Sequence, residues 1–144
     1  MPLNLATGSF LVALCVLVHT AGLMLISVWT PRLAQRFGLH NYDLGRTMVM
    51  TASVLGIFAL HTVEVWIWAT TYAGLGATTD FLSALDLSTA MFSTVGYGGV
   101  VFNPAWRLLT ALEGINGFIL IGWSTAYLVG ASTRHGPFRK NEHF

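Results

Sequence analysis

The sequence predicts an all-α membrane protein with three transmembrane helices and one short re-entrant segment. Three observations support this prediction. The chain is 54% hydrophobic, and only 9% of its 144 residues are charged. Its apolar residues also gather in three runs of roughly 20 residues, the length that crosses a ~30 Å hydrocarbon core. A soluble domain carries about 25% charged residues, so this chain has too few charges to cover a surface that faces water.

The first apolar run extends from about Ser9 to Trp29, and His19 and the thiol of Cys15 are its only ionisable groups. A signal peptide is the alternative reading. However, no positively charged segment precedes the run, and it is longer than the roughly 7–15 residues of a usual signal-peptide core. Residues 1–30 are therefore expected to form an additional N-terminal transmembrane helix.

A polar segment, residues 31–47, follows and is expected to form a cytoplasmic loop. Pro31 suits the start of a helix and Gly38 its end. We therefore expect a short helix on the membrane surface within this segment, with Leu33 and Phe37 directed toward the lipid.

Residues 48–131 are expected to form a module of two spans with a short segment between them. The first of these spans covers about Met48 to Trp68, and the second about Leu108 to Val129. Residues 132–144 are expected to form a short cytoplasmic tail.

The short segment lies between these two spans. Residues 69–80 are rich in Thr, Gly and Ala and predict a loop. Phe81 to Ser93 is helical in pattern but, at about 13 residues, too short to cross a bilayer. Asp80 suits the N-cap of this short helix.

The basic residues indicate how the spans are oriented, because they concentrate on the cytoplasmic side of a membrane. Apart from Arg107, all of them fall after the first span or after the third, which predicts an outside N-terminus and a cytoplasmic C-terminus in the inner (plasma) membrane. The short helix must then enter from outside. These basic residues are Arg32, Arg36, Arg46, Arg134, Arg139 and Lys140. The aromatic residues expected to form a belt at the outer boundary are Trp66, Trp68, Tyr72 and Trp106.

The short helix is followed by the segment Ser93-Thr94-Val95-Gly96-Tyr97-Gly98-Gly99. Non-helical backbone at membrane depth is tolerated where it is buried in protein or lines a water-filled cavity. Glycines at alternate positions permit conformations that other residues resist, so successive carbonyl oxygens can turn toward one axis. Thr-Val-Gly-Tyr-Gly is the known filter signature of potassium channels, in which four such loops replace the hydration shell of the ion.

The chain resembles the two-helix pore module of the potassium channel superfamily over about Leu55 to Val129. The resemblance includes the runs FSTVGYGG, HTVEVWIWATTY and PAWRLLTALEGINGFILIGWSTAYL, as in small bacterial channels with one extra N-terminal helix. It implies a homotetramer in the lipid bilayer, a re-entrant pore helix and selectivity filter, and K⁺ in the filter without an organic cofactor. The expected K⁺ ligands are Thr94, Val95, Gly96 and Tyr97, with Gly98 closing the filter.

Two positions depart from the usual pattern of that superfamily. Gly99 stands where an acidic residue often follows the filter, and Ser93 stands where threonine is common. Selectivity rests on the filter carbonyls and is less affected by these changes than conductance or filter inactivation.

The resemblance suggests Gly117 as the hinge of the third span. Close helix packing through a small residue is the equally weighted alternative. With Gly117 placed this way, Phe118, Ile121 and Thr125 are expected to border the cavity below the filter, with Val129 near the inner mouth.

Ionisable residues within spans are functional candidates by default. His61 and Glu64 are three residues apart and share one helix face. They could sense external pH, or Glu64 could bond to His61 or to the short helix as a structural link that supports the filter. Glu113 is expected to lie behind the short helix and brace the filter. Asp86 belongs either to the surface or to the same network, and His19 is expected to be bonded between helices.

The expected function is passive K⁺ conduction through a central tetrameric pore. The alternatives are a weakly selective cation channel, because of Gly99, and a non-conducting regulatory membrane subunit. Enzymatic activity is not expected, since no nucleophile–base pair, metal-ligand spacing or phosphate loop is present. The seven basic residues form no patch dense enough to bind nucleic acid.

Overall fold

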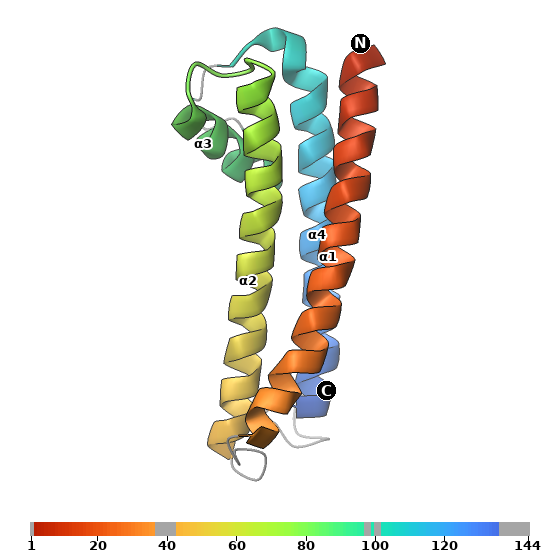
Figure 1. Cartoon of the computed structure of the whole chain (residues 1–144), viewed down its shortest axis with the longest axis vertical. Coiled ribbons are helices and arrows are strands. Elements are labelled where there is room, and N and C mark those ends of the chain that lie inside the picture. Colours follow the sequence, from red (N-terminus) through yellow and green to blue (C-terminus); the bar gives the residue numbers. More distant parts are fainter. Residues whose placement is uncertain (1, 37–42, 97–98, 100–101, 136–144) are drawn as a thin grey trace.

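The computed structural model describes residues 2–36, 43–96, 99 and 102–135, and its regular elements are all helical (Figure 1). Three of its helices are long and apolar enough to cross a membrane. The predicted all-α class is therefore confirmed for the described residues, and each predicted span corresponds to one of these long apolar helices. The elements are α1 (Pro2–Arg36), α2 (Asp43–Gly74), α3 (Phe81–Phe92), the 3-10 turn η2 (Pro104–Trp106) and α4 (Arg107–His135).

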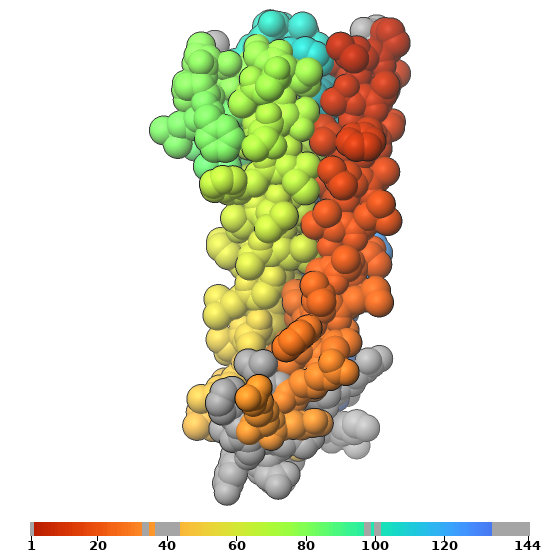
Figure 2. Space-filling view, in the orientation of Figure 1, coloured from red at the N-terminus to blue at the C-terminus, as the bar shows by residue number. Residues whose placement is uncertain are grey.

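The three long helices lie side by side, with α1 in contact with both α2 and α4 (Figure 1). The short helix α3 packs against α2 and α4 at the end that carries the N-terminus. The described end of α4 lies at the opposite end. In the space-filling view, α3 stands out from the bundle beside α2, and directly below α3 the face shows α2 and α1 (Figure 2).

Helices α1 and α2 pack as an antiparallel pair through small residues. A side-chain carbon added at Gly22 would lie 2.5 Å from Leu60, and one added at Gly56 would lie 3.1 Å from Ile26. Both pairs are equally distant in sequence from residue 41, so one register brings both into contact. Small residues let helix backbones approach closely in this way.

The first helix is longer than predicted, and the expectation that Pro31 begins a separate helix is wrong. Helix α1 continues through Pro31 to Arg36. Proline removes one helical hydrogen bond, but the residues that follow it include strong helix formers such as Leu, Ala, Gln and Arg. Phe37 and Gly38, expected in the surface helix, lie outside the described residues.

The loop expected over residues 69–80 is only half as long as predicted, because α2 continues to Gly74. The helix closes with a bond from the amide of Ala77 to the carbonyl of Tyr72, at 2.9 Å. Gly76 supplies the left-handed conformation (φ +62°) that this kind of helix end requires. Burial of Tyr72 favours the extra helical turn, which sequence pattern alone does not reveal.

The short helix was predicted closely. It spans Phe81–Phe92, and Asp80 is its N-cap, with its carboxylate accepting from the amide of Ser83 at 2.9 Å. Helix α4 begins at Arg107, one residue before the predicted start, and runs past the predicted end at Val129 to His135. The first residues of the expected tail are therefore helical.

Candidate functional site

The segment after α3 turns back beside the carboxyl end of that helix. The amide of Thr94 donates to the carbonyl of Met91, and the amide of Gly96 donates to the carbonyl of Ala90, both at 3.0 Å. Thr94 and Gly96 have φ angles of +63° and +96°. Glycine adopts such angles readily, whereas a β-branched residue rarely does. The backbone is therefore left-handed at two alternate positions of the predicted filter.

Val95, between these two residues, exposes 79% of its side chain in the single chain. Gly99, which follows the predicted filter, also has a positive φ of +88°. Tyr97 and Gly98 lie outside the described residues, so the structure does not describe the remaining two positions of the signature.

Glu113 lies behind α3, in a buried group that joins three helices. Its carboxylate accepts hydrogen bonds from the hydroxyl of Tyr72 on α2 and from that of Ser88 on α3, both at 2.5 Å. All three side chains are buried. The position predicted for Glu113 is therefore the one observed, and Tyr72 lies in the core instead of the expected aromatic belt. Trp68 is likewise fully buried.

Asp86 does not join this group. It is exposed on α3, and the described partners of Glu113 are Tyr72 and Ser88 instead. Of the two locations weighed for Asp86, the surface is the one observed.

Gly117 faces the carboxyl end of α3. A side-chain carbon at this position would overlap the carbonyl group of Phe92. Helix α4 continues without interruption through this residue. Close packing, one of the two interpretations of Gly117, is thus what the structure describes.

The residues expected to border a cavity follow one exposed face of α4. Phe118 exposes 70% of its side chain and Ile121 exposes 38%, and Thr125 is exposed one turn further along. Val129 lies on the same helix and is also exposed. These residues share a face because they recur every three or four positions.

The chain matches the family model described as "Ion channel" over residues 58–134, which is more than half of its length. The chain belongs to this ion channel family. Among curated proteins and among solved structures, none matches it. The matched region contains about half of α2, all of α3, the predicted filter and nearly all of α4. This channel is a multi-pass membrane protein by its family and its three apolar helices, and α1 is an addition to the family's two-helix core.

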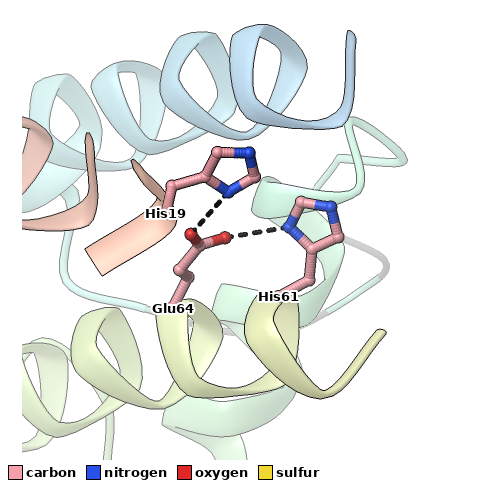
Figure 3. Close-up of side chains that lie close together, drawn as sticks. All are labelled: His19, His61 and Glu64. Atoms are coloured by element: carbon pink, nitrogen blue, oxygen red, sulfur yellow. Dashed lines mark hydrogen bonds and ion pairs between the residues drawn. The ribbon is translucent and has the colours of Figure 1, made fainter. Parts of the chain in front are cut away.

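A second buried polar group joins α1 to the core of the channel (Figure 3). Glu64 lies between two histidines, with its Oε1 atom 2.9 Å from Nδ1 of His19 and its Oε2 atom 2.8 Å from Nδ1 of His61. Ser124 Oγ lies 3.4 Å from Nε2 of His19 and 3.1 Å from Nε2 of His61. The group therefore includes side chains from α1, α2 and α4.

The contact between His61 and Glu64 is one of the alternatives predicted from the sequence. His19 was expected to bond between helices, but not to this carboxylate, and Ser124 was missed. A signal was nevertheless present. His19 and Glu64 are almost equally distant from residue 41, the centre of the antiparallel pair that α1 and α2 form.

Proposed function

We propose that this ion channel conducts K⁺ passively through a central pore formed by four copies of the chain. Thr94, Val95, Gly96 and Tyr97 would supply the oxygen ligands, and Gly98 would close the filter. The observation that carries this proposal is the filter signature Thr-Val-Gly-Tyr-Gly, which directly follows the half-length helix α3 in a chain of the ion channel family.

The fold favours a cation at this position. The carboxyl end of a helix carries a partial negative charge, and the segment with Thr94 and Gly96 lies beside the carboxyl end of α3. Carbonyl oxygens that replace the hydration shell are the basis of K⁺ binding in filters of this sequence. Glu113, bonded to Ser88 on α3, would hold this helix in place behind the filter.

One chain supplies one loop, so a closed ring of ligands needs several copies. Exposed apolar side chains on the same chain support such an assembly. Val95 exposes 79% and Phe118 exposes 70% of its side chain in the isolated chain. In a homotetramer, Phe118, Ile121 and Thr125 would border the cavity below the filter.

We place the channel in the inner (plasma) membrane with the N-terminus outside and the C-terminus in the cytoplasm. Arg36, at the end of α1, and Arg46, near the start of α2, lie at the end of the bundle opposite α3 (Figure 1). Basic residues concentrate on the cytoplasmic side. The filter would then lie near the outer surface.

The test is ion flux through the purified channel in liposomes. Vesicles loaded with K⁺ take up a tracer of Rb⁺, and external Na⁺ and Ba²⁺ are tested as competitor and blocker. We expect uptake that Ba²⁺ blocks, that Na⁺ does not reduce and that Gly96→Ala abolishes. Uptake that Na⁺ reduces would favour the weakly selective cation channel. The observation behind this alternative is that Gly99 stands where an acidic residue often follows the filter. A folded tetramer without flux at any pH or lipid composition tested would contradict conduction and favour a regulatory subunit.

A further inference from the structure

The buried group of His19, His61, Glu64 and Ser124 has a chemistry that K⁺ conduction does not use. Two imidazoles and a carboxylate converge, each offering one ligand atom, and these atoms lie within 4.8 Å of one another (Figure 3). The side chains of His19 and Glu64 are fully buried, and that of His61 is 19% exposed. Such a set of ligands from two spans requires a physical explanation, because buried charge is costly in a membrane.

The charge of Glu64 is matched only in part. Within the described residues, its ion-pair partners are His19 and His61, and no lysine or arginine is paired with it. With both imidazoles neutral, the group carries one negative charge. Burying a carboxylate is costly unless it is paired and hydrogen-bonded, and with both imidazoles neutral a bound cation would supply the pairing charge.

The hydrogen bonds also leave this group one partner short. If both Nδ1 atoms donate to Glu64, both Nε2 atoms are acceptors. The hydroxyl of Ser124 lies within reach of both but has only one hydrogen to donate. One imidazole nitrogen is then left without a donor, and buried acceptors of this kind are normally satisfied.

We propose that His19, His61 and Glu64 form a binding site for a divalent transition-metal ion of the Zn²⁺ type. The two Nδ1 atoms and the carboxylate would be the ligands. Each imidazole then carries its proton on Nε2, and both can donate to the oxygen of Ser124, which has two lone pairs. Each imidazole nitrogen then has a partner, the charge of Glu64 is paired with the ion and the loaded site carries one net positive charge. Ser124 fixes the orientation of both rings, as outer partners of metal-bound histidines do.

The distances suit an ion of this size. Zn²⁺ binds nitrogen and carboxylate oxygen at about 2.0–2.2 Å, so two of its ligands in a tetrahedral arrangement lie roughly 3.3 Å apart. The present separations of 2.9 Å (His19 to Oε1 of Glu64) and 2.8 Å (His61 to Oε2) would open by about 0.4–0.5 Å. The ligand atoms all lie within 4.8 Å of one another, and any separation wider than roughly 3.3 Å would close toward that value on binding. Of the three ligands, His61 is the one with exposed side-chain surface, 19% in the single chain.

Such an ion would tie α1 to the two-helix core of the channel. His19 is on α1, whereas His61 and Glu64 are on α2, inside the region that matches the ion channel family. The site lies within one chain and does not depend on conduction or on tetramer formation. It can therefore be tested separately from the proposed function.

The experiment measures bound metal on the purified channel, with no added histidine tag. The protein is stripped with a chelator, equilibrated with Zn²⁺ and washed, and zinc is then measured by mass spectrometry. We expect about one ion per chain in the wild type and less than about a tenth of that in Glu64→Gln, because removing a ligand abolishes a three-ligand site. The matched control replaces the other three histidines (His40→Gln, His135→Gln and His143→Gln) and should keep the ion.

A second variant keeps the test decisive if Glu64→Gln does not fold. Ser124→Ala retains all three ligands but removes their outer partner, and a loss of about 10–100-fold in Zn²⁺ affinity is expected. Three results would overturn the proposal: no zinc retained by the wild type, zinc lost when the other histidines are replaced, or unchanged affinity in Ser124→Ala. If the wild type retains no zinc, a single proton shared among His19, His61 and Glu64 would be the explanation in place of a metal ion.

Discussion

The hydroxyl of Tyr72 donates a hydrogen bond to the carboxylate of Glu113, with 2.5 Å between the two oxygens. Tyr72 belongs to the last turns of α2 and Glu113 to the second turn of α4, so this bond links the two spans of the family's core. The second oxygen of Glu113 accepts from Ser88 on α3. One buried carboxyl group thus connects all three helices around the proposed filter.

Replacing Tyr72 by phenylalanine should destabilise the channel, because one oxygen of Glu113 would lose its partner in a buried site. The expected loss is about 1–3 kcal/mol in the free energy of unfolding. It is measured by denaturation of the purified protein in detergent. Thr62→Val is the matched control on the same helix, since the hydroxyl of Thr62 is exposed and bonds to the carbonyl of Phe58 in its own helix. Equal stability of both variants would show that the bond to Glu113 contributes nothing.

The spans and the short helix could be predicted because their signals are local. The length of an apolar run and a cap such as Asp80 act within one segment of chain. The ends of α1 and α2 could not be predicted in the same way. Helix α1 runs through Pro31, and α2 gains an extra turn that packs Tyr72 into the core. Both outcomes depend on neighbouring residues and on helices distant in sequence.

The partners across helices were the least predictable part of the site. The bond from His61 to Glu64 follows from their spacing along one helix. The bond from His19 to Glu64 depends on the register of α1 against α2, which the contact between Gly22 and Leu60 helps to set. A search for polar residues equally distant from the connection between two spans would have paired His19 with Glu64.

Gly117→Ala should destabilise the channel even though alanine is the better helix former. Its methyl group would overlap the backbone carbonyl of Phe92, which cannot rotate away as a side chain could. Gly114→Ala is the matched control, one turn earlier on α4, where the added carbon would lie at an ordinary 3.6 Å from the carbonyl of Met91. There the gain in helix propensity, up to about 1 kcal/mol, should leave stability unchanged or raised.

The two variants are compared by the temperature at which the purified protein unfolds in detergent. A lower unfolding temperature is expected for Gly117→Ala alone. If both variants behaved alike, the close contact between α4 and the end of α3 would not be a determinant of stability. Flux measured on the same preparations would show whether that contact also positions the filter.

The N-cap of α3 should make stability depend on pH in the acid range. Asp80 accepts hydrogen bonds from the amide of Ser83 and from the hydroxyls of Ser83 and Thr79, and these bonds, the amide first, lower the pKa of its carboxyl below the ordinary 3.8. Because the folded-state pKa is the lower one, the charged cap stabilises the fold at all pH values above the pKa of the unfolded chain. This contribution is lost as the pH falls through the folded-state pKa.

Asp80→Asn tests this dependence, since asparagine also caps helices but does not titrate. The unfolding temperatures of wild type and variant are measured from neutral pH to about 2, below the ordinary carboxyl range. We expect the wild type to be the more stable above the carboxyl range, and its advantage to shrink toward the acid end. An advantage that persists unchanged to the lowest pH would exclude the charge of Asp80 as its source.

Alanine substitutions at two glycines with positive φ angles can distinguish a structural role from a role in conduction. Gly76, at the end of α2, has φ +62°, and Gly96, in the proposed filter, has φ +96°. An added side-chain carbon meets no atom within 4 Å at either position, so alanine would strain the backbone without a clash. Left-handed backbone costs a residue with a side chain about 1–2 kcal/mol. The φ angle of Gly96 lies outside the left-handed α region that other residues can adopt, so we expect Gly96→Ala to lose at least as much stability as Gly76→Ala.

Of the two variants, only Gly96→Ala should stop uptake of Rb⁺ by channel-containing liposomes. Gly96 would present its carbonyl to the ion, whereas Gly76 lies at the end of α2, outside the proposed filter. Gly76→Ala should retain uptake at the level of the wild type, once the amounts of folded protein are made equal. Loss of uptake in both variants would attribute the effect to folding, and uptake retained in both would contradict a filter at Gly96. The pair thus tests the ligand role of the segment after α3 against a second glycine substitution that also strains the backbone.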